Sequence, residues 1–381
     1  MNQRFAPRLI LGAPEDVGFC PDRWQRVLEM AEDLCRSREI PALSFQVQRN
    51  GRTTGTHHFG SRSLNQALPV TDETLFLVAS LTKPIVATGV LILVERGLLA
   101  LNQPVQDFLP EMKEAAKRPM TVQHLLSHTS GLPDMLPENE ELRRAHASLR
   151  QFVEKSCQIE LLFPPGRNAQ YQSMGYALLG EILQRVSGQS CAEFLHQELF
   201  APLGMNHTFL GLPEQFSNFE QIAEIDLDDS LRSATGWNWN SNYWRRLGAP
   251  WGGVLSTAAD LSQFLHLMLI GGKPGSQGGL LSPASISEAI RNRLDDFPSI
   301  PDAERRTRGW GLGWRLNWKS HRHSFCDLLP AEAAGHWGAT GTLFWMDRDR
   351  DLGAVLLGTR PLSDQVSPLT RLSNLIVAAL C

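Results

Sequence analysis

The first sixty residues change from a helical to a strand-like pattern of apolar positions. Residues 21–38 carry apolar side chains at helical spacing, which predicts an amphipathic helix. Residues 42–48 alternate as a strand does, and Asn50-Gly51 follows them. Asn-Gly is a strong hairpin signal because both turn positions need positive φ. A return strand is therefore expected over residues 53–59.

The C-terminal part of the chain has the same strand character. Residues 309–318 are rich in Trp and Leu and predict a strand. Residues 341–346 and 352–358 flank a charged turn, which predicts a second hairpin. Residues 367–380 predict a closing helix, with Ser367 as N-cap and a proline in the first helical position.

The middle of the chain, roughly residues 84–305, has mostly helical periodicity, for example over residues 174–186 and 258–269. The simplest arrangement is an antiparallel sheet built from both chain ends and flanked by helices, with a helical lobe inserted. We therefore predict an α/β (α+β) fold. Residues 1–83 and 306–381 would form the sheet lobe, and a cleft between the lobes is the expected ligand site.

Length and charge narrow the range of partners. A chain of 381 residues suits one large two-lobed unit. The formal net charge is −4, with 36 Lys and Arg against 40 Asp and Glu, so no basic footprint predicts a nucleic-acid partner. The most apolar stretch, residues 84–94, is too short to span a bilayer.

The six cysteines are scattered, with no C-x-x-C pair. This spacing predicts neither a zinc site nor a disulfide framework, and it favours free thiols in a reducing compartment. No apolar segment typical of a secretory signal follows residues 1–7, so a cytoplasmic location is expected unless the chain has been trimmed. We assign no metal and no cofactor.

The first candidate for chemistry is a serine and a lysine three residues apart, Ser80 and Lys83, at a predicted helix start. At this spacing the two side chains share a face and reach each other. A desolvated lysine can lose its own proton and then accept the proton of the serine, which makes the serine a nucleophile. Such pairs also arise by chance, and a surface helix start is the better explanation of this one in isolation.

A tyrosine and a serine, Tyr171 and Ser173, form the second candidate. A tyrosine hydroxyl beside a cationic lysine ionises more readily and can pass a proton to a leaving group. The alternative is a buried core tyrosine, which is the interpretation that we adopt for Tyr176.

The glycine-rich segment 335–342 is the third candidate, and it contains His336, Trp337, Gly338 and Ala339. It precedes an edge-like strand, where small residues let a substrate approach the backbone closely. A backbone N–H in this segment could then stabilise an oxyanion. A simple glycine-rich turn is the alternative.

The three candidates occur along the chain in the order S-x-x-K, Y-x-S, H-x-G. With its motifs in this order and at this spacing, the chain resembles the superfamily of class C β-lactamases, D-alanyl-D-alanine peptidases and family VIII esterases. The resemblance extends over most of residues 12–380. Further segments similar to that superfamily are residues 121–132, 176–180, 186–188, 202–205 and 252–261.

The resemblance implies a role for each matched residue. Ser80 would be acylated, and Lys83 would act as the base or tune Tyr171. Tyr171 would protonate the leaving group and later help to activate water. The backbone N–H groups of Ser80 and Ala339 would form the oxyanion hole. His336 stands where penicillin-recognising members often carry lysine.

Two residues depart from the pattern of the superfamily. Ser173 stands where asparagine is typical, and serine is shorter with one donor fewer. Trp337 stands where a small residue is usual, and it would make the cleft narrower and more apolar. Both changes disfavour β-lactam and peptidoglycan substrates. The tryptophans of residues 237–251 form either a packed loop or an aromatic wall of the cleft, with Trp251 the best candidate for the wall.

We therefore expect a serine hydrolase that acts on a small-molecule acyl substrate through a Ser80 acyl-enzyme, with a carboxylic ester preferred. One alternative is a β-lactamase, a D-alanyl-D-alanine carboxypeptidase or a D-aminopeptidase with the same machinery. The other is a non-catalytic scaffold that has kept the fold, which the intact Ser80, Lys83 and Tyr171 disfavour. The oligomeric state and the acyl group stay open.

Overall fold

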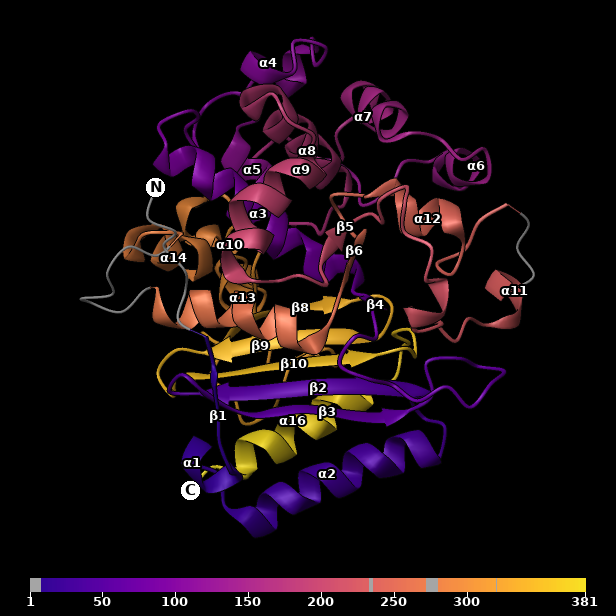
Figure 1. The fold of residues 1–381 in the computed structure, drawn as a ribbon. Coiled ribbons are helices and arrows are strands. Elements are labelled where there is room, and N and C mark those ends of the chain that lie inside the picture. Colours follow the sequence, from indigo (N-terminus) through magenta and orange to yellow (C-terminus); the bar gives the residue numbers. More distant parts are fainter. Residues whose placement is uncertain (1–7, 233–235, 272–279, 320) are drawn as a thin grey trace.

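The structure is a computed structural model that describes residues 8–232, 236–271, 280–319 and 321–381 (Figure 1). Residues 1–7, on which the expectation about a secretory signal rests, lie outside the described residues.

A seven-stranded sheet joins the two ends of the chain, in the order β1-β3-β2-β10-β9-β8-β7. Every neighbouring pair is antiparallel except β1 and β3, which are parallel. The predicted antiparallel sheet from both chain ends is thereby confirmed. Its strands are β1 (Ile10–Leu11), β2 (Ala42–Arg49), β3 (Arg52–Gly60), β7 (Arg315–Leu316), β8 (Ala334–Gly338), β9 (Thr342–Asp347) and β10 (Leu352–Gly358).

Both predicted hairpins are confirmed. Strands β2 and β3 are joined through Asn50 and Gly51, whose φ angles of 51° and 74° are the positive values that this turn requires. In strands β9 and β10, Asp347 and Leu352 are opposite partners at the end next to the charged turn.

The prediction of one strand over residues 309–318 is wrong, because only Arg315–Leu316 is strand. The segment before it turns tightly, and the N–H of Gly311 donates to the carbonyl of Trp314. A side chain at Gly311 would lie 2.2 Å from the carbonyl oxygen of Ala289. The glycines therefore let this turn pack closely on neighbouring helices, and a strand pattern of Trp and Leu does not reveal that.

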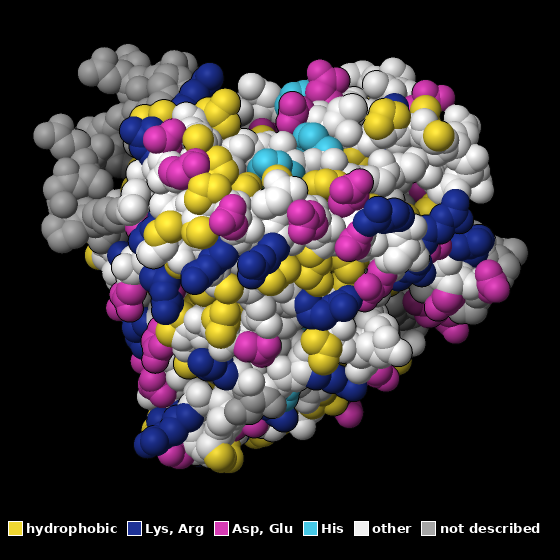
Figure 2. Space-filling model, turned by 90° about the horizontal axis from the view of Figure 1, so that it is seen from below, with side chains coloured by type: hydrophobic (Ala, Val, Ile, Leu, Met, Phe, Trp, Pro, Cys, Tyr) yellow, Lys and Arg dark blue, Asp and Glu magenta, His cyan; other side chains and the backbone are white. Residues whose placement is uncertain are grey.

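Two helices from opposite ends of the chain cover one face of the sheet (Figure 1). They are α2 (Pro21–Arg36) and α16 (Pro368–Ala378), and they pack on each other. The hydroxyl of Ser367 accepts the N–H of Leu369, which confirms the predicted N-cap. Figure 2 shows that acidic and basic side chains are interspersed over this side of the molecule, with no large field of one sign.

The helical part of the chain lies on the other face of the sheet (Figure 1). Helix α13 (Ala258–Ile270) packs directly on β2 and β10, and α3 (Thr82–Glu95) is buried along most of its length and packs on α8 (Met174–Ser187). A small sheet in the order β4-β6-β5 lies among these helices. Its strands are β4 (Phe76–Leu77), β6 (Val254–Ser256) and β5 (Phe209–Leu210).

Shorter helices complete the fold. The helix that begins at Cys191 is α-helical to Leu195 and continues as a π-helix over His196–Phe200. The other α-helices are α1 (Pro14–Val17), α4 (Val105–Phe108), α5 (Val122–Leu126), α6 (Asn139–Arg144), α7 (Leu149–Gln158), α9 (Cys191–Leu195), α10 (Ala201–Leu203), α11 (Asp229–Arg232), α12 (Asn242–Leu247), α14 (Pro283–Ile290) and α15 (Asp302–Thr307).

The lobe boundaries at residues 83 and 306 stay a prediction, although residues 84–305 are mainly helical in the structure. Within the described part of the chain, no helix is long and apolar enough to cross a bilayer. All six cysteines are described, and none is in a disulfide.

Candidate active site

A strained turn presents Ser80 at the start of α3. Ser80 lies in the 3-10 turn Ala79–Leu81, and Ala79 has a φ of 49°, which is unfavourable for a residue with a side chain. The hydroxyl of Thr82 donates to the carbonyl of Ala79 at 2.7 Å and accepts the N–H of Val254 at 3.1 Å. These bonds tie the turn to β6, so the position of Ser80 is set by packed backbone.

The structure brings Ser80, Lys83 and Tyr171 into one hydrogen-bonded cluster. Lys83 Nζ lies 3.0 Å from Ser80 Oγ and 2.6 Å from Tyr171 Oη, and Tyr171 Oη donates to Ser80 Oγ at 2.6 Å. Lys83 Nζ also donates to the backbone carbonyl of Trp251 at 2.8 Å. All three side chains can therefore exchange protons directly.

The environment of Lys83 favours its neutral form. The ammonium group is fully buried, and burial lowers the pKa of Lys83 to about 7, with the carboxylate of Asp134 opposing the shift. A substantial fraction of Lys83 is thus deprotonated near neutral pH and able to accept a proton. Sequence reasoning missed Asp134, which sits in an ordinary loop pattern.

Tyr171 behaves differently from the expectation that a nearby lysine would make it ionise more readily. Burial is the largest influence and raises the pKa of Tyr171, the charge of Asp134 adds to the increase, and the hydrogen bond with Ser80 opposes it. The phenol therefore stays protonated in the resting enzyme, so it can donate a proton. Ser173 is buried as well.

Two buried histidines flank Tyr171. The ring of His336 on β8 lies 6.1 Å from that of Tyr171, and the ring of His128 lies 4.9 Å from it. Burial, followed by the charge of Lys83, lowers the pKa of both histidines well below its usual value, so both are neutral. His128 accepts the N–H of Gln172 and thereby helps to hold Tyr171, a role that sequence reasoning did not assign.

The turn after β8 is fixed against the segment that precedes Ser80. The hydroxyls of Thr340 and Thr342 donate to the carbonyls of Leu77 and Val78 at 2.6 Å and 2.8 Å. A side chain at Gly338 would lie 2.3 Å from the carbonyl oxygen of Val78, so the strand approaches this closely only with glycine.

A cavity of about 260 Å³ opens above the cluster. Trp337 lines it, as expected, and its indole N–H donates to the carbonyl of His323 at 2.8 Å. Ala339 lies in the same wall, beside Ser80. The full lining is Ser80, Tyr171, Trp310, Arg315, Trp318, His323, His336, Trp337, Ala339 and Leu362.

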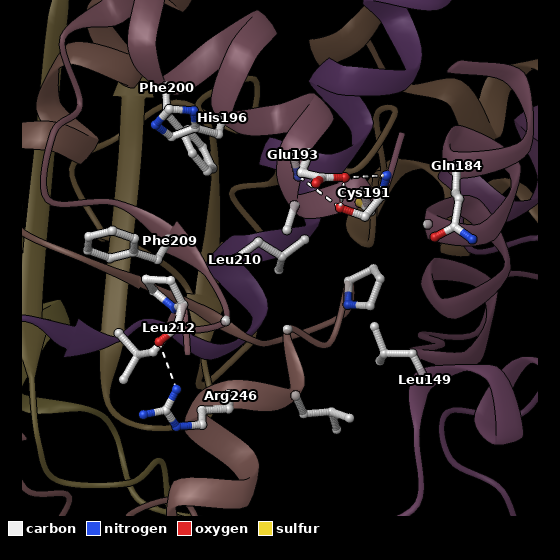
Figure 3. Close-up of a pocket in the computed structure, with 18 of the residues that line it drawn as sticks. Leu149, Gln184, Cys191, Glu193, His196, Phe200, Phe209, Leu210, Leu212 and Arg246 are labelled. Carbon is white, nitrogen blue, oxygen red and sulfur yellow. Dashed lines mark hydrogen bonds between the residues drawn. The ribbon is translucent and has the colours of Figure 1, made fainter. Parts of the chain in front are cut away.

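Trp251 takes part through its backbone rather than its ring. Its indole packs on Trp244, and Trp251 is among the residues that line a separate cavity of about 550 Å³ in the helical part of the molecule. Figure 3 shows other residues of this lining, such as Leu149 and Glu193. Trp237 and Trp244 enclose the guanidinium of Arg143, at 4.4 and 4.5 Å from the two ring centroids. This packing favours the packed loop of the two alternatives, and Trp251 is not among the residues that line the cavity beside Ser80.

Comparison with known proteins agrees with this geometry. The family model described as Beta-lactamase matches residues 26–378. Penicillin-binding protein 4 of Amycolatopsis lactamdurans is 30% identical over 84% of this chain and 80% of its own length, and esterase EstB of Burkholderia gladioli is 28% identical over 89% and 91%. A solved penicillin-binding protein homologue from Caulobacter crescentus superposes with a TM-score of 0.77 at 25% identity, over 95% of this chain and 99% of that one.

Sequence, fold and relatives thus agree, and the chain belongs to the β-lactamase family of serine hydrolases.

Proposed function

We propose that this protein hydrolyses carboxylic esters of small acyl groups through an acyl-enzyme on Ser80. The observation that carries the proposal is the cluster of Ser80, Tyr171 and a buried Lys83 with a lowered pKa, at the floor of a cavity of about 260 Å³. A nucleophile, a base and a proton donor within hydrogen-bond distance are what acyl transfer requires.

The proton movements follow from the geometry. Neutral Lys83 accepts the proton of Ser80, directly or through Tyr171, as Ser80 Oγ attacks the substrate carbonyl. The N–H groups of Ser80 and Ala339 stabilise the resulting oxyanion. Tyr171 then donates a proton to the oxygen of the leaving alcohol and is reprotonated by Lys83. Water attacks the acyl-enzyme by the reverse relay, which releases the acid and restores Ser80.

Three residues favour an ester over a β-lactam. Ser173 is buried and, as a serine, offers no amide to a β-lactam side chain. His336 is neutral where a cationic lysine would attract a carboxylate. Trp337 adds apolar surface that suits a short acyl chain. The esterase among the relatives supports this choice.

The second candidate is a β-lactamase, a carboxypeptidase or a D-aminopeptidase that uses the same cluster. The penicillin-binding protein among the relatives favours it, and so does the guanidinium of Arg315 in the cavity wall, because such substrates carry a carboxylate.

A side-by-side assay of the purified protein separates the two. We expect a higher kcat/KM for short-chain aryl esters than for a chromogenic cephalosporin, with Ser80→Ala inactive on both. Each polar contact missing for the cephalosporin costs about 1 kcal/mol. A higher kcat/KM for the cephalosporin would put the second candidate first.

A further inference from the structure

Tyr171 stands on a loop, although its hydroxyl has to stay in contact with two partners. Residues 164–173 precede α8 and form neither helix nor strand. Tyr171 Oη nevertheless lies 2.6 Å from both Ser80 Oγ and Lys83 Nζ. A reacting group that is misplaced by about 1 Å can lose roughly 10²-fold in rate. Contacts other than secondary structure therefore have to hold this loop.

Two glutamines flank Tyr171, and their surroundings differ. Gln170 is exposed, and its side chain makes no hydrogen bond within the described part of the chain. Gln172 is fully buried, with 0% of the residue exposed. Burying a side-chain amide is costly unless its donors and its acceptor find partners. Of the two, only Gln172 can hold the loop from inside the protein.

The side-chain amide of Gln172 is bonded at both its nitrogen and its oxygen. Nε2 donates to the carbonyl of Leu125 at 3.1 Å and to that of His124 at 3.4 Å. Oε1 accepts a hydrogen bond from the hydroxyl of Ser130. An amide nitrogen carries two donors, so both are used, and the two carbonyls determine which end of the group is the nitrogen. Helix α5 and the turn after it thus bind Gln172 at three points.

The backbone next to Tyr171 adds a fourth bond to this anchor. The N–H of Gln172 donates to Nδ1 of His128 at 3.1 Å. A side chain at Gly175 would lie 2.7 Å from Nε2 of Gln172, so the glycine leaves room for the amide. The loop that carries Tyr171 is thereby joined to residues 124–130 through both backbone and side chain.

We propose that Gln172 is a positioning residue of the active site, which keeps the hydroxyl of Tyr171 within reach of Ser80 and of the leaving group. Gln172 is not among the residues that line the cavity beside Ser80, so it acts through Tyr171 and not on the substrate. The inference rests on the proposed function, in which Tyr171 protonates the leaving alcohol. The pattern Y-x-S leaves its middle position open, so this role becomes visible only in the structure.

The test compares an ester that needs the proton of Tyr171 with one that does not. Ethyl butyrate and 4-nitrophenyl butyrate share the acyl group, but ethoxide is a poor leaving group, whereas 4-nitrophenolate leaves without protonation. Gln172→Met keeps the length of the side chain and removes its hydrogen bonds. In this variant kcat/KM for ethyl butyrate should fall on the order of tenfold more than kcat/KM for 4-nitrophenyl butyrate, which is part of what a general acid contributes. General loss of structure would instead lower both values equally.

Two further variants locate the effect. Ser130→Ala removes one of the three side-chain bonds and should give the same selective loss at a smaller size, and it decides the matter if Gln172→Met does not fold. Gln170→Met is the matched control, because it changes the same residue type on the other side of Tyr171, and it should leave the ratio of the two kcat/KM values unchanged. Equal losses for both esters in Gln172→Met, or a selective loss of the same size in Gln170→Met, would overturn the proposal.

Crystal structures of the variants separate this proposal from the ester proposal. In Gln172→Met, Tyr171 Oη should lie beyond hydrogen-bond distance of Ser80 Oγ, while in Gln170→Met it should keep the distance of 2.6 Å. A displaced Tyr171 supports the role of Gln172 even if none of the esters is cleaved. An unmoved Tyr171 in Gln172→Met overturns that role even if esters are hydrolysed.

Discussion

The two cavities of this molecule differ in how their charged side chains are paired. In the cavity of about 550 Å³, the charged groups are paired with protein: Glu181 with Arg185, and Glu193 with Ser190 (Figure 3). The cavity of about 260 Å³ instead holds a buried Arg315 without a counter-ion and a His336 Nε2 without a hydrogen-bond partner. Unsatisfied and pKa-shifted groups, rather than volume, indicate where the chemistry takes place.

The sharpest contrast between the cavities should come from Ser80→Ala. Ser80 supplies the only aliphatic hydroxyl among the residues that line the smaller cavity, so we expect ester kcat to fall by at least ~10³-fold in this variant. The steady-state rate of a short-chain aryl ester measures this. Residual activity above a tenth of the original would contradict the assignment.

Lys83→Ala and Tyr171→Phe should each lower kcat by at least ~10²-fold, the scale of a lost general base or acid. The double variant should lose far less than the product of the two factors, because both residues serve one proton relay. A double-mutant kinetic series checks this. Independent, multiplicative losses would speak against a shared relay.

The smaller cavity should also give the activity its pH dependence. Lys83 must be neutral to accept a proton, and its pKa is lowered to about 7, so kcat/KM should fall as the pH drops below about 7 and level off above it. A pH profile between about pH 5 and pH 9 measures this. Activity that rises toward low pH would contradict a neutral Lys83 as the base.

A substitution in the larger cavity should have the smallest effect. Leu149 is half-buried in its lining, and Leu149→Phe should fill space there while changing ester kcat/KM by less than about twofold. Thermal denaturation serves as the folding control. A loss comparable to that of Lys83→Ala would show that the larger cavity, through Trp251 and its carbonyl on Lys83, takes part in catalysis.

Local patterns predicted much of the sheet and its covering helices. Asn50-Gly51 and the N-cap Ser367 are short-range features that need no knowledge of the rest of the chain, and both are confirmed. The closely spaced Ser80 and Lys83 could likewise be paired from the sequence, because one helical turn determines their separation.

Long-range packing could not be predicted in the same way. The segment 309–318 has the apolar pattern of a strand. It forms a turn instead, which packs Gly311 against Ala289 and is followed by Arg315 in the cavity wall. The pKa of Tyr171 likewise follows from burial, which overrides the nearby lysine. Such effects depend on which distant residues meet, and a one-dimensional pattern does not contain that information.

The most direct test of the account is covalent labelling of Ser80. Intact-protein mass spectrometry after treatment with a fluorophosphonate probe should show one adduct on the unaltered protein and none on Ser80→Ala, since the probe reacts with an activated serine. Peptide mapping should place the adduct on Ser80. An unlabelled native protein, or labelling that persists in Ser80→Ala, would contradict the assignment of Ser80 as the nucleophile.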